Sequence, residues 1–169
     1  MNCRTVGVFA IGLLASLSAC QRPVVSGPPE LRLGRDQCAH CGMMISDDRF
    51  AGSLLVGADD PEALVFDDIG CMLEYDREHA AETRGAARFV RDYQGRCWLA
   101  AADAHYLCCD RERLRTPMGS GVVAFGTLAA AENKRAECGG RVGNEATALA
   151  MLRESAMPDV GASAPAPPG

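Results

Sequence analysis

Short apolar runs separated by turn residues occupy the chain between residues 33 and 154. They predict strands at 50–56, 63–66, 87–93, 97–102 and 121–125, and helices at 128–137 and 145–152. A further helix is expected after residue 67, because Asp67 or Asp68 can cap it and Ile69, Met72 and Leu73 recur at helical spacing.

The order of these elements repeats. The first series consists of a strand, Phe66, a helix and Phe89-Val-Arg-Asp92. The second series has the same order: a strand, Phe125, a helix and Gly140-Arg-Val142. We therefore predict an α+β fold made of two small β-β-α-β units with antiparallel sheets. The first unit is placed at 33–95 and the second at 96–154. Residues 155–169, rich in proline and alanine, are predicted to be a disordered tail.

The N-terminal segment predicts export. One basic residue precedes an apolar stretch that is too short for a permanent membrane span, so residues 1–19 are interpreted as a signal peptide. Leu17-Ser-Ala-Cys20 resembles a bacterial lipobox, in which Cys20 becomes the lipid-modified N-terminus; ordinary cleavage near Ala19 is the alternative. We expect a tether at 20–32 and a domain on the periplasmic side of a membrane, with Gln21 favouring the outer membrane.

Charge narrows the choice of partners. After removal of residues 1–19 the chain carries 16 basic and 22 acidic residues, a net charge of −6. An acidic chain without a basic cluster argues against nucleic acid as a partner. It also leaves the lipid as the expected membrane anchor.

Seven cysteines remain in the predicted mature chain, an odd number for an oxidising compartment. At least one is therefore expected to be free, metal-bound or paired with a cysteine of another chain. Four of the seven cysteines lie outside the Cys38-x-x-Cys41 motif and are not Cys71. We interpret these four as core residues or as an incidental disulfide: Cys97, Cys108, Cys109 and Cys138. Trp98 is interpreted as a core residue.

Cys38-Ala-His-Cys-Gly-Met-Met-Ile45 has three possible meanings. Structural zinc requires four closed ligands, and the sequence shows no second cysteine or histidine pair for them. A thiol–disulfide oxidoreductase would place its Cys-x-x-Cys between a buried strand and a helix, whereas Gly42 directly follows this one. A soft-metal site would use the methionines of the motif as well as its cysteines. Thiolates and thioethers together select Cu(I).

In the soft-metal interpretation, Cys41 and Met43 project to one side of an extended segment, and Cys38 assists. Met118, in Thr116-Pro-Met-Gly-Ser-Gly121, is the expected distant donor. Cys71 and His40 are possible additional ligands, although a buried structural cysteine and a solvent-facing histidine are their ordinary roles. Met44 is expected to face the core.

Four motifs occur in an order that resembles the NosL family, the lipoprotein accessory factors of nitrous oxide reductase. They are Cys38-Ala-His-Cys-Gly-Met-Met-Ile45, Val65-Phe-Asp-Asp-Ile-Gly-Cys-Met-Leu73, Thr116-Pro-Met-Gly119 and Gly121-Val-Val-Ala-Phe125. The resemblance spans residues 36–145. It implies two β-β-α-β units like a domain of organomercurial lyase. It also matches Cys41 and Met43 to the family's Cys-Gly-Met metal motif, and Met118 to its Pro-Met-Gly motif.

The same resemblance implies a periplasmic Cu(I) chaperone rather than an enzyme. It would help deliver copper for the multicopper site of nitrous oxide reductase. Its expected partners are that reductase, a copper/sulfur-delivery membrane transporter and a periplasmic β-helical accessory protein. A periplasmic thiol–disulfide oxidoreductase that uses Cys38 and Cys41 is the alternative function.

Overall fold

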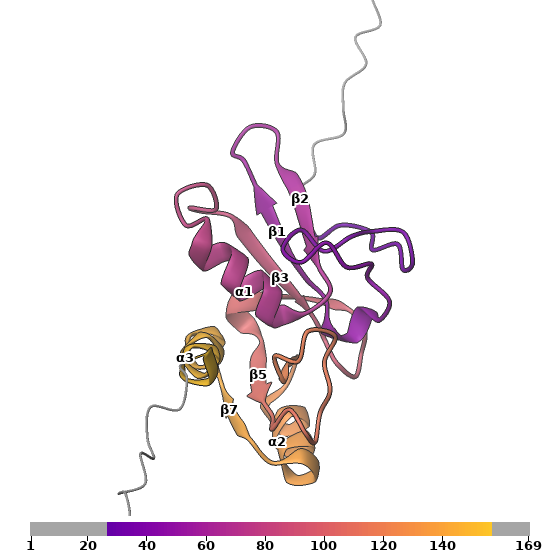
Figure 1. The fold of residues 1–169 in the computed structure, drawn as a ribbon, viewed down its shortest axis with the longest axis vertical. Helices are drawn as coiled ribbons and strands as arrows, with labels where there is room; N and C mark the ends of the chain where they lie inside the picture. The colour runs from indigo at the N-terminus through magenta and orange to yellow at the C-terminus, as the bar shows by residue number, and fades with distance from the viewer. Residues whose placement is uncertain (1–26, 157–169) are drawn as a thin grey trace, which may run out of the picture.

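The computed structural model describes residues 27–156, and each half of this region contains one sheet. The sequence-based predictions for Cys20, the signal peptide and most of the tail fall outside the described residues. Within them, two antiparallel sheets and three α-helices follow one another along an elongated molecule (Figure 1). The predicted α+β class is confirmed.

The first sheet has the strand order β2-β1-β3-β4. Its strands are β1 (Gly52–Val56), β2 (Glu62–Phe66), β3 (Ala87–Arg91) and β4 (Trp98–Ala100). Helix α1 (Ile69–Glu78) joins β2 to β3 and packs against β1 and β2. The predicted β-β-α-β order is therefore present.

The second sheet has the order β6-β5-β7. Its elements are β5 (His105–Cys108), β6 (Val122–Phe125), α2 (Leu128–Cys138), β7 (Arg141–Gly143) and the final helix α3 (Glu145–Ala156). The opening strand of this unit is β5, a stretch for which the sequence analysis predicted no strand. The predicted strand at 97–102 is shorter and forms β4, at the edge of the first sheet instead.

The strands β5 and β6 of the second sheet pack against a core on each face. Tyr106 and Val122 point into a core shared with α1 and the first sheet. Their strand neighbours Leu107 and Val123 point into a second core beneath α2. This alternation follows from the two-residue period of a strand, and it explains why every residue of β6 is buried.

The two units meet along β3 and β6. Asp92 forms an isolated parallel bridge with Ala124, and the N–H of Tyr93 donates to the Ala124 carbonyl at 2.9 Å. Helix α1 also contacts both β6 and α3. The start of α1 therefore lies where the first unit faces the second. None of the helices in the described part of the chain is long and apolar enough to cross a bilayer.

Candidate metal site

Residues 37–44 form a tight turn that holds the Cys-x-x-Cys motif. The N–H of Cys38 donates to the carbonyl of Met43 at 2.8 Å, and that of Gly42 donates to the carbonyl of Cys38 at 2.9 Å. Gly42 has a φ of +74°, a conformation that glycine adopts without a Cβ penalty. The expected extended segment is thus a turn, and the two-residue repeat of a strand does not align Cys41 with Met43.

This turn lies against the end of β2. The N–H of Ala39 donates to the carbonyl of Val65 at 2.8 Å, which holds the turn beside the junction of β2 and α1. Asp67 lies in that junction, and Cys71 follows in the first turns of α1. The Cys41 thiol donates to Asp67 Oδ1 at 3.6 Å. Three chain segments therefore converge on one point.

The convergence produces a cluster of four potential ligand atoms. The Sγ atoms of Cys38, Cys41 and Cys71 and a carboxylate oxygen of Asp67 all lie within 4.8 Å of one another. Cys38 and Cys71 are 3% and 4% exposed, whereas Cys41 is half-buried. We call these four residues the thiol cluster. The cluster also contains four donors, the number that a closed zinc site requires, which the sequence alone did not show.

The thiols of the cluster differ in acidity. A hydrogen bond from the Cys71 thiol holds the pKa of Cys38 well below its ordinary value and raises the pKa of Cys71. Burial raises the pKa of Cys41. Burial also raises the pKa of Asp67 to about 7, with a hydrogen bond to Cys38 adding to the effect. Cys38 is therefore the most acidic of the three thiols, which favours binding of a cation beside it.

A pocket of about 190 Å³ opens over this cluster. Cys41 and Cys71 lie on its wall, together with His40, and Met118 lines it from the second unit. His40 is not freely solvated: its Nε2 lies 3.6 Å from Glu74 Oε2. The structure thus brings Met118 to the same pocket as two of the thiols, although it lies more than forty residues away in sequence.

The loop that carries Met118 is anchored to the start of α1 by Asp68. This carboxylate is fully buried and caps the helix, accepting from the Gly70 N–H at 2.7 Å. It also accepts from the Thr116 hydroxyl at 2.6 Å, from the Met118 N–H at 3.0 Å and from the Ser120 hydroxyl. A buried carboxylate requires such partners, and here they fix the thioether loop.

Close packing completes this anchor. A Cβ on Gly70 would lie 2.4 Å from the Cβ of Ser120, closer than two side chains can approach. Next to Ser120, Gly121 has a φ of +72°, and a Cβ there would lie 2.5 Å from the Cys109 carbonyl oxygen. Glycine at position 70 lets the two units approach each other at the site, and glycine at position 121 lets the loop pack against the end of β5 within the second unit.

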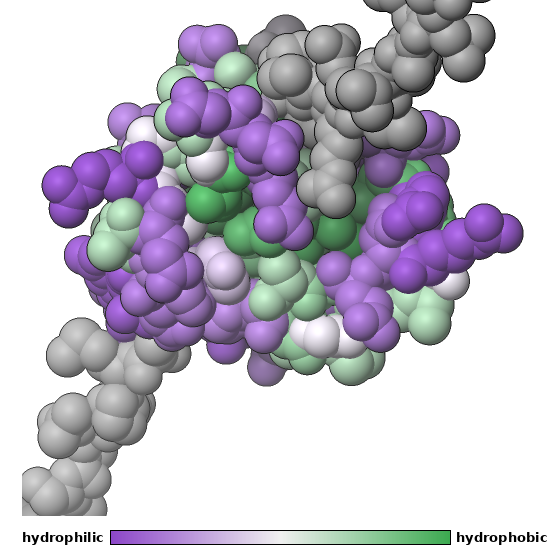
Figure 2. Space-filling model, turned by 90° about the horizontal axis from the view of Figure 1, so that it is seen from above, coloured by the Kyte–Doolittle hydropathy of each residue, from purple (hydrophilic) through white to green (hydrophobic). Residues whose placement is uncertain are grey.

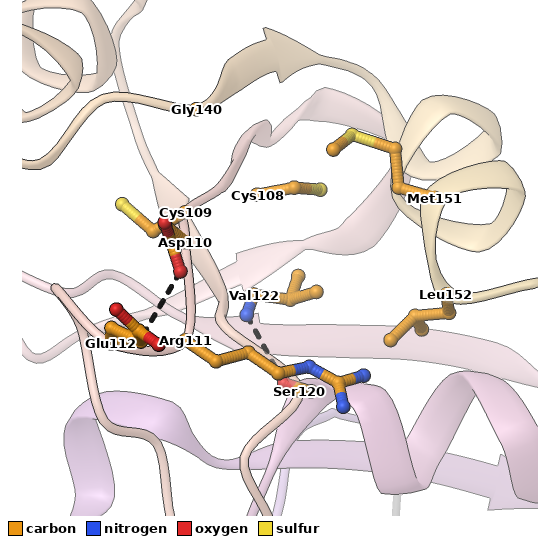
Figure 3. Close-up of a pocket in the computed structure, with 10 residues that line it drawn as sticks. All are labelled: Cys108, Cys109, Asp110, Arg111, Glu112, Ser120, Val122, Gly140, Met151 and Leu152. Carbon is orange, nitrogen blue, oxygen red and sulfur yellow. Dashed lines mark hydrogen bonds between the residues drawn. The ribbon is translucent and has the colours of Figure 1, made fainter. Parts of the chain in front are cut away.

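A larger pocket of about 480 Å³ adjoins the first and shares Arg111, Ser120 and Leu152 with it. Figure 3 shows the Arg111 side chain reaching past Ser120, at the boundary between the two pockets. The Cys108 side chain lies on the far side, facing α3. Burial raises the pKa of Cys108 to about 11, so this thiol stays protonated and differs from Cys38.

Comparison with known proteins supports one assignment. The sequence profile of the NosL family matches residues 32–147 of the 169. The chain belongs to the NosL family. Among solved structures, the crystal structure of the copper chaperone NosL from Shewanella denitrificans is similar, with 17% sequence identity and a TM-score of 0.56. The match covers 70% of this chain and 96% of that chain. No curated protein matches the sequence.

This NosL-family chain exposes its motif methionines. Among the described residues, the exposed large hydrophobic side chains are Leu33, Met43, Met44, Met118 and Leu128. Met44 is 54% exposed, so its predicted place in the core is wrong; Met43 is 58% exposed and does not line the pocket. Apolar side chains also gather on the face seen from above, within a hydrophilic margin (Figure 2).

The other cysteines take three different roles. Cys109 and Cys138 form a disulfide, and Cys108 is a buried free thiol. Both outcomes agree with the prediction that these residues are core positions or form a disulfide. Cys97 is exposed, which contradicts its predicted core position. Trp98 is only partly buried, and its Nε1–H donates to the Pro29 carbonyl at 3.0 Å, so it anchors the N-terminal segment rather than the core.

The sequence analysis missed Asp67 as a member of this NosL-family site, because either of two adjacent aspartates could have been the helix cap. The structure assigns the cap to Asp68 and leaves Asp67 facing the thiols. One signal was available: Asp67 and Cys71 are four residues apart across the start of a helix. That spacing can bring a side chain before the helix near one on its first turn.

Proposed function

We propose that this chain is a Cu(I)-binding chaperone. The observation that carries the proposal is the meeting of Cys41 and Cys71 with Met118 in one pocket, above a third thiol, Cys38. Thiolate and thioether donors select Cu(I) over harder ions. Membership of the NosL family and the fold shared with a protein described as a copper chaperone support it.

The arrangement suits transfer as well as binding. Cys41 is half-buried, and Met118 is 47% exposed, so an incoming donor can reach an ion held between them. Met43, on the same turn as Cys41, supplies a second exposed thioether. Copper would then move by ligand exchange: one donor of the acceptor binds as one donor of this chain leaves. The Cys41 thiolate takes up a proton when it leaves the metal, and a thiol of the acceptor releases one when it binds.

The proposed setting is the periplasmic side of a bacterial outer membrane. Cys20 would carry the lipid anchor, and the lipobox-like Leu17-Ser-Ala-Cys20 supports this placement. The proposed destination of the copper is the copper site of nitrous oxide reductase. The transporter and the accessory proteins that serve this reductase would be partners, as the family resemblance implies.

A titration with Cu(I) under anaerobic conditions, against a competing chelator, tests the binding step. We expect one ion per chain, a loss of affinity of more than about 100-fold in Cys41→Ser, and smaller losses in Met118→Leu and Met43→Leu. Cys97→Ser is the matched control, since Cys97 is a free thiol outside the cluster. Unchanged affinity in all three test variants would refute the proposal.

Delivery is tested separately. Loaded protein is mixed with copper-free nitrous oxide reductase, and copper transfer is followed with loaded Cys41→Ser as the comparison. We expect transfer from the wild type and not from the variant. A wild type that binds copper but never releases it to the reductase would restrict the function to copper storage.

A thiol–disulfide oxidoreductase is the second candidate, favoured by the lowered pKa of Cys38 and its nearness to Cys41. Two observations weigh against it. Cys38 is 3% exposed, and no helix begins after Cys41 to stabilise a thiolate there. Insulin reduction by the reduced protein, abolished in Cys41→Ser, would support this function. A pair that never forms a reversible disulfide would exclude it.

A further inference from the structure

The deepest part of the thiol cluster contains more donors than an exposed transfer site needs. Cys38 and Cys71 lie in the core beside Phe66 and Met72, and each is almost inaccessible to solvent. Core cysteines ordinarily act as small apolar side chains. Packing alone does not require their sulfur atoms to converge with a third thiol and a carboxylate.

The spacing of the donors fits a bound ion. Because no two of the donor atoms are more than 4.8 Å apart, a point between the three sulfurs lies within about 2.8 Å of each, against about 2.3 Å for a metal–thiolate bond. Side-chain adjustments of about half an ångström close that difference. The turn that carries Cys38 and Cys41 can make them without disturbing β2 or α1, since neither residue belongs to a helix or a strand.

Cys41 belongs to two donor sets. On one side it faces Cys38, Cys71 and Asp67 in the cluster. On the other it lines the pocket that Met118 shares. Cys71 also lines this pocket but is only 4% exposed, whereas Cys41 is half-buried. A shift of the ion around the Cys41 sulfur would therefore exchange its buried partners for the exposed Met118.

We propose that the chain holds Cu(I) in two positions that share Cys41. The inner position uses the buried thiolates of Cys38 and Cys71, with the Asp67 carboxyl beside them. The outer position uses the Met118 thioether, which lines the same pocket as Cys41. The inner position retains the ion, and the outer position presents it to an acceptor. This inference rests on the proposed copper-binding function and adds a buried resting site to it.

The inner position separates retention from release. An ion held by the buried sulfurs of Cys38 and Cys71 and the half-buried sulfur of Cys41 is shielded from water and from small competing ligands. At the outer position, the same ion has weaker thioether donors and an open side. The acceptor therefore competes against thioethers rather than against a full set of thiolates, and the chaperone can bind tightly without blocking transfer.

X-ray absorption of the protein loaded with one equivalent of Cu(I) tests the resting position. Methionine is replaced by selenomethionine, so that thioether ligation appears as a copper–selenium contact. We expect three sulfur neighbours around copper and no selenium neighbour. A copper–selenium contact together with a single sulfur would place the resting ion at the outer position and overturn the inference.

Variants give an independent readout. Cys38→Ser and Cys71→Ser should each lower Cu(I) affinity by about 10- to 100-fold and speed the release of copper to a chelator. Both should also reduce the sulfur count. Cys108→Ser, another buried thiol outside the cluster, is the matched control and should change neither. Melting curves of the metal-free proteins identify a variant that does not fold, and Cys71→Ala then replaces Cys71→Ser.

The outcomes separate this inference from the proposed function. If Cys38→Ser and Cys71→Ser both keep wild-type affinity and release rate while Cys41→Ser does not bind, the inner position is overturned and the chaperone function stands. If the wild type does not bind Cu(I), both fail. Because three cysteines and a carboxylate also suit Zn²⁺, Zn²⁺ that Cu(I) cannot displace would overturn the inference as well.

Discussion

The two β-β-α-β units use cysteine in opposite ways. In the first, Cys38, Cys41 and Cys71 are free thiols that converge at the start of α1. In the second, Cys109 and Cys138 form a disulfide between the end of β5 and the end of α2. One unit presents sulfur to a ligand, and the other uses sulfur to join its own elements.

The surroundings of the sulfurs account for this difference better than burial does. Cys38 and Cys138 are almost equally buried, but Cys138 packs in the second core with Leu107 and Phe125. Cys38 has the Asp67 carboxyl and a second thiol within hydrogen-bonding reach. Thiols beside polar groups and a pocket are available for chemistry, whereas a disulfide between apolar elements stabilises a fold.

The largest expected effect concerns the first unit with its ligand. At a free Cu(I) concentration a thousand times the dissociation constant, binding should stabilise the wild type by about 4 kcal/mol. Cys41→Ser should lose this gain while its metal-free stability changes by less than about 0.5 kcal/mol. Thermal unfolding with and without copper measures both. Equal copper stabilisation of the two proteins would remove Cys41 from the site.

The disulfide should show the reverse pattern. Cys109 and Cys138 are separated by 29 residues, so replacing both by alanine should lower the free energy of unfolding by about 3.5 kcal/mol through loop entropy. Copper affinity should stay at the wild-type value under conditions in which the variant is folded. Denaturant unfolding and a chelator titration test the two parts. Loss of copper binding by a folded variant would contradict the separation of roles.

The link between the units is tested at Asp68. Asp68→Asn replaces one acceptor oxygen by an amide that faces donors, so the loop of Met118 should loosen from α1. We expect about a tenfold loss of copper affinity. Combined with Met118→Leu, the loss should be less than additive, because both changes remove the same thioether. Asp103→Asn, at an exposed position, is the control; full additivity would exclude an anchoring role.

The smallest expected effect is the dependence of copper affinity on pH. The pKa of Cys41 and that of Cys71 are raised, so both are protonated near neutrality and must lose a proton to bind copper. Affinity should therefore fall as the pH is lowered through the neutral range. Cys38, whose pKa is lowered, contributes no change there. Chelator competition at several pH values measures the slope, and a flat profile would contradict the assignment.

Much of the fold could be predicted because its signals are local. Alternation, turn residues and caps identify β1, β2, α1, β3, β6, α2 and α3 to within a few residues. The strand β5 could not be identified in this way. Its residues follow the run that forms β4 with no glycine or proline between the two strands, so no turn signal marks where β5 begins. The strand β6, which is also buried on both faces, is preceded by Gly119 and Gly121 and could therefore be identified.

The candidate site could be predicted only in part, because local sequence patterns identify single motifs but not which motifs meet in the fold. The motif around Cys41 is contiguous and could be recognised, and the Gly/Pro-framed loop identified Met118 as an expected donor. The predicted place of Met44 was wrong because the chain turns at residues 39–41 instead of continuing as a strand. The convergence of Cys71 and Asp67 with the motif depends on how β2 lies beside the turn, which no local pattern specifies.

Asp67 and Asp68 are neighbours along the chain, yet one faces the thiols and the other holds the loop of Met118. Adjacent Cα atoms are always about 3.8 Å apart. The spacing between the two sulfur-bearing segments is therefore set by covalent geometry at a single peptide. Substitution of side chains elsewhere in the core leaves that spacing unchanged. Insertion of one residue between the two aspartates would destroy it, so this junction should tolerate substitution around it but no change in length.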